Sequence, residues 1–183
     1  MNEKPFIVSM LRFDSETDAR IQTMMSRIRH SIGIPESSDS FPHVSLIPTT
    51  LEDRDGVIDR LSERFASHPA IEIAFSHIGL FPSGVLFLGV TPTEALITLH
   101  QQVYSASAPG PQTPWIDLYR PGRWIPHCTV AMEMPNKSLE RAVKEACECV
   151  AFPLVGTCVS IELLEVRPGQ PLRTLRTIDL MAS

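Results

Sequence analysis

The sequence lacks the features that would place the chain in a membrane or in an oxidising compartment. No part of its 183 residues approaches the roughly 18 consecutive apolar residues that a membrane-spanning helix needs. The apolar run near the start is too short for a secretory signal, and no small-residue cleavage site follows it. The four cysteines include no CxxC pair of the kind that binds zinc. We therefore expect a cytoplasmic protein without a membrane partner, whose cysteines are reduced thiols.

Positive charge is also scarce. The chain has 16 Lys and Arg residues against 21 Asp and Glu residues, which gives a formal net charge of −5. Proteins that hold long nucleic acid usually present a basic face, because neutralising phosphates supplies most of their affinity. An extended nucleic-acid track is therefore disfavoured, whereas a local pocket for a small phosphorylated ligand stays open.

The sequence does contain one short pattern that occurs twice. The segments Pro42-His43-Val44-Ser45-Leu46 and Pro126-His127-Cys128-Thr129-Val130 both read Pro-His, any residue, a hydroxyl side chain, then an apolar residue. At average residue usage, two such strings would arise by chance in about one chain in ten thousand of this size. We therefore look for a function that needs both copies.

The surrounding pattern predicts an internal duplication. Each half shows a strand, a helix, a motif strand, a helix and a strand, over residues 6–13, 15–32, 41–47, 53–67 and 71–76 and then 85–90, 93–106, 125–132, 137–149 and 152–158. Strands at 159–166 and 174–181 close the chain. We predict an α+β fold in a single domain over residues 1–183, with pseudo-symmetric lobes built around the motif strands 42–47 and 126–131. Two antiparallel sheets would then flank a central cleft.

Alternation along a strand separates the roles of the motif residues. Because alternate side chains share a face, His43 and Ser45 point one way, and His127 and Thr129 do the same in the second motif. The intervening residues point into the core; these are Val44, Leu46, Cys128 and Val130. Each motif thus presents an imidazole and a hydroxyl together.

Two histidines on opposite sides of a phosphate can divide its acid and base chemistry. One imidazole removes a proton from the attacking group while the other protonates the departing oxygen, because histidine titrates near neutral pH. The hydroxyls of Ser45 and Thr129 can donate hydrogen bonds to the phosphate oxygens. A zinc site is the alternative, but it needs three or four ligands and no further ligand accompanies this pair. We predict catalysis without a metal or cofactor.

The other histidines lack such a partner pattern. We predict solvated or capping roles at helix ends or faces for three of them and a place at the start of a turn over 77–84 for the fourth; these are His30, His68, His100 and His77. The segment 107–124 is rich in Pro and Gly and long for a loop, which favours either a functional lid or a surface excursion.

The two motifs resemble the His-x-Ser/Thr-apolar pair of the 2H phosphoesterase superfamily, and most of all its 2′-5′ RNA ligase-like branch, also described as RNA 2′,3′-cyclic phosphodiesterases. The resemblance implies hydrolysis of 2′,3′-cyclic phosphates of nucleotides or RNA ends to 2′-phosphates, and in some members the joining of RNA ends through 2′-5′ bonds. It implies that His43 and His127 are the acid/base pair, with His43 as the acid, and that Ser45 and Thr129 hold the phosphate.

Four further residues are candidates for substrate binding. Arg123 would lie on the cleft face if the second motif strand begins that early, and it could pair with a phosphate. Tyr119 and Trp124 could stack on a base, and Phe41 lies on the His43 side of its strand. Local packing or a solvated loop is the alternative for each of them.

Two other functions stay open at this stage. We expect the protein to be a monomer. One alternative is a binding protein that recognises a phosphorylated nucleotide or RNA end without turnover. The other keeps the chemistry but changes the substrate to another small cyclic phosphate, such as a cyclic phosphate of ADP-ribose. Both motifs are complete, which favours an enzyme.

Overall fold

The computed structural model describes residues 4–35, 40–107, 116–135 and 138–182. In these residues the elements run β1 (Phe6–Phe13), α1 (Ser15–Ile32), β2 (Val44–Thr50), the 3₁₀ turn η1 (Leu51–Asp53), α2 (Arg54–Phe65), β3 (Ile71–Phe81), β4 (Val85–Val90), α3 (Glu94–Ser107), the 3₁₀ turn η2 (Ile116–Tyr119), β5 (His127–Ala131), α4 (Leu139–Cys149), β6 (Leu154–Val166) and β7 (Arg173–Asp179). No helix of the described segments is long and apolar enough to cross a membrane.

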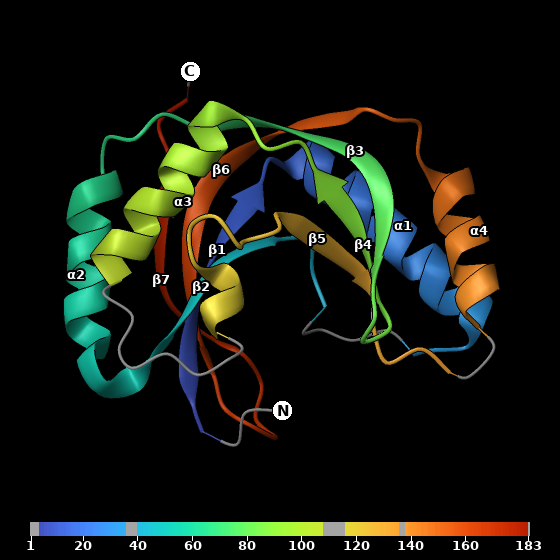
Figure 1. Cartoon of the computed structure of the whole chain (residues 1–183), viewed down its shortest axis with the longest axis horizontal. Coiled ribbons are helices and arrows are strands. Elements are labelled where there is room, and N and C mark those ends of the chain that lie inside the picture. The colour runs from blue at the N-terminus through green and yellow to red at the C-terminus, as the bar shows by residue number, and fades with distance from the viewer. Residues whose placement is uncertain (1–3, 36–39, 108–115, 136–137, 183) are drawn as a thin grey trace.

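The described strands form one antiparallel sheet in the order β2-β1-β6-β3-β4-β5, with β7 on the second half of β6. Helices α2 and α3 pack together on one side of the molecule, and α1 and α4 pack together on the other (Figure 1). The α+β prediction is confirmed. The two predicted sheets are joined into one, because the long strand β6 pairs with β3 through its first part and with β1 through its second part.

The predicted duplication is visible in the pairing of the strands. The order β1-α1-β2-α2-β3 is repeated by β4-α3-β5-α4-β6. Each half gives its last strand to the other, because β6 pairs with β1 and β3 pairs with β4. The two halves are therefore interwoven through the middle of the sheet.

Irregularities of the strands repeat as well. A β-bulge leaves Leu46 unpaired in β2 and Val130 unpaired in β5, in both cases directly after the motif hydroxyl. A second bulge leaves Ser76 unpaired in β3 and Val159 unpaired in β6. Because a bulge changes which face the following residues occupy, matching bulges show that the two halves share one backbone design.

The core lies between the sheet and the helices, and the alternation of β1 shows how it forms. Ile7, Leu11 and Phe13 join the main hydrophobic cluster under the helices, whereas Val8 and Met10 face the other side and join a small second cluster. The second cluster includes Phe41 at its edge. The face opposite the helices thus carries some apolar packing next to the first motif.

Helix α1 begins and ends where the sequence predicts, because both ends are capped. The carboxylate of Asp14 accepts from the Thr17 backbone N–H at 2.9 Å and from the Thr157 N–H at 2.7 Å. At the other end Gly33 adopts φ 73°, and its N–H and that of Ile34 close on the carbonyls of the last turn. Asp14 therefore also ties the helix to β6.

Two predictions of secondary structure are wrong. The turn predicted over 77–84 is strand as far as Phe81, and the tight turn occupies only the residues before Val85. The two strands predicted at 152–158 and 159–166 are the single strand β6. Glycines and prolines suggested an early turn, but Gly79 lies inside β3, where the Phe87 ring occupies the space its side chain would need.

The Asp14 cap gives a prediction for stability. Burial acts to raise the pKa of Asp14, but hydrogen bonds from Thr17 and Thr157 outweigh it and hold the pKa below its ordinary 3.8. We expect Asp14→Ala to lower the free energy of unfolding in urea by about 1–2 kcal/mol at neutral pH. A carboxylate with a lowered pKa stabilises above its unfolded pKa, so this difference should shrink as the pH falls below about 4.

The matched control is Asp55→Ala, which removes an exposed carboxylate paired with Arg54. It should change the free energy of unfolding by less than about 0.5 kcal/mol. A difference for Asp14→Ala that stayed constant down to acid pH would contradict the proposed contribution of the ionised cap.

Candidate active site

The two motif strands are the opposite edges of the sheet, yet the structure brings them together. The indole Nε1 of Trp124, just before β5, donates to the backbone carbonyl of Ser45 at 3.0 Å. The Cys128 thiol lies against the backbone N–H of His43; that contact acts to lower its pKa, but burial dominates and raises it to about 12. The curvature of the sheet therefore places both motifs in one site.

The two histidines are held in the same way. Nδ1 of His43 lies 2.8 Å from the carbonyl of Phe41, and Nδ1 of His127 lies 2.7 Å from the carbonyl of Ile125. A carbonyl oxygen can only accept, so Nδ1 carries the proton in both neutral rings. Nε2 then has the free lone pair in each ring, which is the atom that can take a proton from a substrate.

The surroundings of both rings favour the neutral form. Burial is the main cause that lowers the pKa of each imidazole, and the bonds to the carbonyls of Phe41 and Ile125 oppose it. The positive charges of Arg12 and His127 lower the pKa of His43 further. His127 thus lies close enough to His43 for its charge to act on that imidazole.

The predicted division of faces is confirmed. Val44, Leu46, Cys128 and Val130 are fully buried, whereas the residues between them are half-buried. Among hydrogen bonds within the described parts of the chain, none uses the hydroxyl of Ser45 or Thr129. Both hydroxyls are therefore available to a ligand that lies near the imidazoles.

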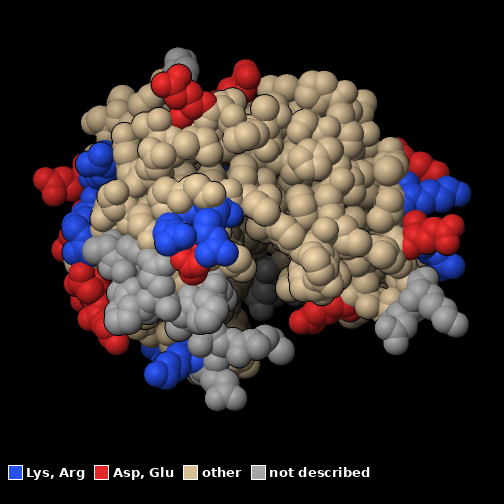
Figure 2. All heavy atoms as spheres, viewed as in Figure 1, with Lys and Arg blue, Asp and Glu red and all other residues tan. Residues whose placement is uncertain are grey.

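A pocket of about 560 Å³ opens beside the second motif. Its walls are mostly apolar, and it contains two motif residues and three predicted specificity residues; the main lining residues are Phe81, Val85, Leu118, Tyr119, Arg123, Trp124, Ile125, His127, Thr129 and Met132. Figure 2 shows that the molecule is hollowed below the centre of this face, between the side of α2 and α3 and the side of α1 and α4. An uncharged, flat group suits such a pocket.

Arg123 lies at this pocket, although not for the reason that the strand pattern suggested. Strand β5 begins at His127, so Arg123 belongs to the preceding loop. Its guanidinium pairs with Asp117, which also lies 3.5 Å from Arg120. In Figure 2 a small group of basic side chains gathers over η2, next to the hollow.

The aromatic candidates make clear local contacts. Trp124 is 9 % exposed and stacks on His100 with ring centroids 4.0 Å apart, and Tyr119 has its hydroxyl pKa raised by burial. The Phe41 ring contacts two basic side chains. The Arg12 guanidinium lies over it, 4.3 Å from the ring centroid, and the centroid of the His43 ring is 5.2 Å away. Their roles toward a substrate remain predictions, and packing accounts for part of each.

His100 is a correction to the sequence analysis. It is not solvated but 1 % exposed, and burial lowers its pKa to about 4. Its Nε2 lies 3.0 Å from the Tyr119 carbonyl, and its ring also interacts with the carbonyl of Leu46 at the bulge of β2. The signal was present, because His100 falls on the same helical stripe as Leu96, Leu99 and Val103.

Two phenylalanines also escaped the sequence analysis. The rings of Phe81 and Phe87 stack at 4.4 Å, and both contact the His127 ring, at 4.9 and 5.3 Å. Phe87 is the cross-strand partner of Thr129. They hold the second catalytic candidate from the side of β3 and β4.

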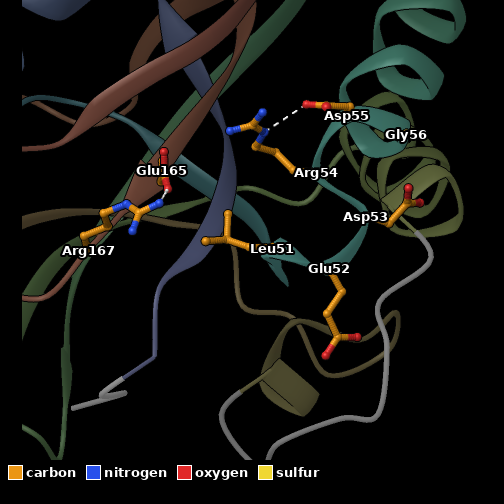
Figure 3. A pocket seen from close by; sticks show the side chains of 8 residues that line it. All are labelled: Leu51, Glu52, Asp53, Arg54, Asp55, Gly56, Glu165 and Arg167. Carbon is orange, nitrogen blue, oxygen red and sulfur yellow. Dashed lines mark hydrogen bonds and ion pairs between the residues drawn. The ribbon is translucent and has the colours of Figure 1, made fainter.

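A second pocket, of about 460 Å³, lies where α2 begins and β6 ends (Figure 3). It contains none of the predicted site residues, and charged side chains line it. Glu165 is 1 % exposed and pairs with Arg167 and, at 3.5 Å, with Arg173, while Arg54 pairs with Asp55 at 2.9 Å. The pairs of Glu165 thus link the end of β6 to β7, and the Arg54–Asp55 pair lies within the first turn of α2. No group of three metal-ligating side chains occurs among the residues that the structure describes.

Comparisons with known proteins agree with this arrangement. A family model described as the 2′-5′ RNA ligase superfamily matches residues 14–170. The crystal structure of apo E. coli LigT has a TM-score of 0.61 at 16% identity, covering 98% of this chain and 99% of that one. The E. coli LigT complex with 3′-AMP has a TM-score of 0.63 at 17% identity, covering 98% of both chains. TT0787 of Thermus thermophilus has a TM-score of 0.66 at 16% identity, covering 97% and 99%. No curated protein matches.

The electrostatic contact between the histidines can be tested directly. Because the charge of His127 helps to lower the pKa of His43, His127→Gln should raise the pKa of His43, measured by NMR titration of the imidazole signals. His30→Gln changes an exposed histidine in the last turn of α1 and should leave that pKa unchanged. An unaltered His43 titration in His127→Gln would mean that the rings do not share a site.

Proposed function

The chain belongs to the 2′-5′ RNA ligase superfamily, and from this premise we propose that it is a metal-independent phosphodiesterase that opens 2′,3′-cyclic phosphates to 2′-phosphates. The observation that carries the proposal is the pair of histidines with protonated Nδ1 atoms and free Nε2 atoms, each with a hydroxyl on its own side, in one site. We propose a small nucleotide or an RNA end as the substrate, acted on by a cytoplasmic monomer.

The reaction needs one proton removed and one supplied. In the proposed mechanism Nε2 of His127 takes a proton from water, which attacks the phosphorus, and His43 protonates the departing 3′ oxygen. The negative phosphate between the rings favours the protonated form of the acid, which offsets the effect of burial on the pKa of His43. Ser45 and Thr129 donate to the non-bridging oxygens, where charge must be stabilised.

The apolar pocket beside His127 suits the nucleoside part of the substrate. Its volume of about 560 Å³ and its aromatic walls are compatible with a base, and Arg123 lies at its edge. E. coli LigT has been crystallised with 3′-AMP and with ATP, which supports a small nucleotide as the ligand here. Joining of RNA ends through 2′-5′ bonds is the same ring opening at the same site with a different nucleophile: the 5′ hydroxyl of a second RNA end attacks the phosphorus in place of water, and the 3′ oxygen departs. We propose it as a further activity.

The assay uses adenosine 2′,3′-cyclic phosphate in the presence of EDTA, with product followed by chromatography. His43→Ala and His127→Ala should each lower kcat by about 10²–10⁴-fold, because each removes one acid or base. His30→Ala, an exposed histidine outside the site, is the control and should keep full activity. Wild-type binding without turnover would favour a binding protein instead, and full activity in either site variant would overturn the acid/base assignment.

The pH dependence gives a second test. A base must be neutral, so activity rises with pH through its pKa; an acid must be protonated, so activity falls above its pKa. Burial lowers the pKa of both free imidazoles below 6.5. The profile of kcat/KM, which reports the free enzyme, should therefore be bell-shaped with its maximum below about pH 6.5. A maximum above pH 8 would contradict this pair of groups.

A further inference from the structure

A third histidine lies on the same face of the sheet as the two motif histidines. In the first part of β3, Ile71, Ile73 and Phe75 point into the core. The bulge at Ser76 shifts this alternation by one residue, so that His77 points to the opposite face. Phe81, four residues on, shares that face and lines the pocket beside the second motif.

A glycine on the next strand makes room for this side chain. His77 pairs with Gly89 across β3 and β4, and Gly89 pairs with His127 across β4 and β5. A Cβ atom on Gly89 would overlap the His77 ring, and the nearest ring atoms are Nε2 and Cε1. His77 therefore extends over Gly89, the residue that lies between it and His127 in the sheet, with Nε2 and Cε1 directly above the glycine.

The first half of the chain has an equivalent cross-strand pair, but there the large and the small side chain have exchanged strands. There the matching pair is Arg12 on β1 and Ser160 on β6, which follows the matching bulge. Arg12 carries the long basic side chain and Ser160 the small one, whereas in the second half Gly89 is small and His77 is basic. Each motif histidine thus has one basic side chain on the flank that faces away from the other motif strand.

The two basic side chains differ in what already binds them. Arg12 lies 3.3 Å from Asp18 and 3.5 Å from Glu162 and stacks on Phe41, so its charge is paired. His77 is exposed, and its Nδ1 lies 3.0 Å from the Ser76 hydroxyl. Its ring packs edge-to-face with Phe87, with the ring centroids 6.5 Å apart. No carboxylate within the described residues forms an ion pair with it. If Ser76 donates to Nδ1, Nε2 carries the proton and can donate it to an anion.

We propose that His77 is a substrate-binding residue whose Nε2–H binds a second phosphate of the substrate, the one on the 5′ oxygen of the nucleoside that carries the cyclic phosphate. This inference rests on the proposed function for the identity of the nucleoside. The cyclic phosphate reacts between His43 and His127, and His77 lies beyond His127 on the side away from His43. A group that reaches it must therefore be another part of the ligand, and an RNA end has its next phosphate at that oxygen.

Binding of product analogues tests the proposal without requiring turnover. Dissociation constants are measured by calorimetry for adenosine 2′-phosphate and adenosine 2′,5′-bisphosphate. The wild-type protein should prefer the bisphosphate, and His77→Phe, which keeps the ring contact with Phe87 but removes both nitrogens, should reduce that preference by about tenfold. His77→Lys keeps a donor at this position and should retain the preference. His30→Phe makes the same change at an exposed site and should not alter it.

The kinetic arm compares three cyclic phosphates: the nucleoside 2′,3′-cyclic phosphate, the same compound with a 5′-phosphate, and a dinucleotide ending in the cyclic phosphate. His77→Phe should lower kcat/KM for the last two by about tenfold more than for the first. An equal loss on all three, a loss on the dinucleotide alone, or no loss would overturn the assignment of His77. A wild type that turns over none of them but prefers the bisphosphate through His77 would overturn the proposed function and leave this inference standing.

Discussion

The site depends on how the free edge of strand β2 is satisfied. An edge strand presents backbone carbonyls without a partner strand, and carbonyls that are withdrawn from water need a donor. Here the Trp124 indole donates to the Ser45 carbonyl, and His100 interacts with the carbonyl of Leu46 at the bulge. These two rings stack on each other, and both come from the second half of the chain. The same contacts that satisfy the first motif strand therefore bring the second motif to it.

The interwoven sheet makes this meeting rigid. Each half contributes a motif strand at one edge and a closing strand to the other half, so neither motif can move without disturbing pairs in the middle of the sheet. Catalytic groups must be held to within a fraction of an ångström of a productive geometry, and strands supported from behind by buried side chains provide such precision. Val44 follows His43 and Cys128 follows His127 in the chain. Both side chains are fully buried and support the motif residues from the core side.

Much of the site could be predicted from the sequence, because the motif residues and their alternation lie within a few consecutive positions. Alternation along a strand is enough to place His43 with Ser45 and to bury Val44 and Leu46, and the repeat of the motif identifies the second set. What could not be predicted depends on partners distant in the chain. Strand pairing decides three such features, and a single sequence carries no periodic signal for it. Strand β6 changes its partner from β3 to β7, Gly79 makes room for Phe87, and a bulge redirects His77. His100 is the exception, since its helical stripe already marked it as buried.

The pairing of β1 with β6 also determines when the fold can be completed during synthesis. Strand β1 can pair early with β2, but its other edge waits for residues 158–166, which are made much later in synthesis. Until then an apolar strand with a free edge is exposed to other nascent chains, which is the condition that favours aggregation. The exchange of strands that makes the mature site rigid thus delays its assembly, because the first half of the chain cannot close its sheet before the second half has been made.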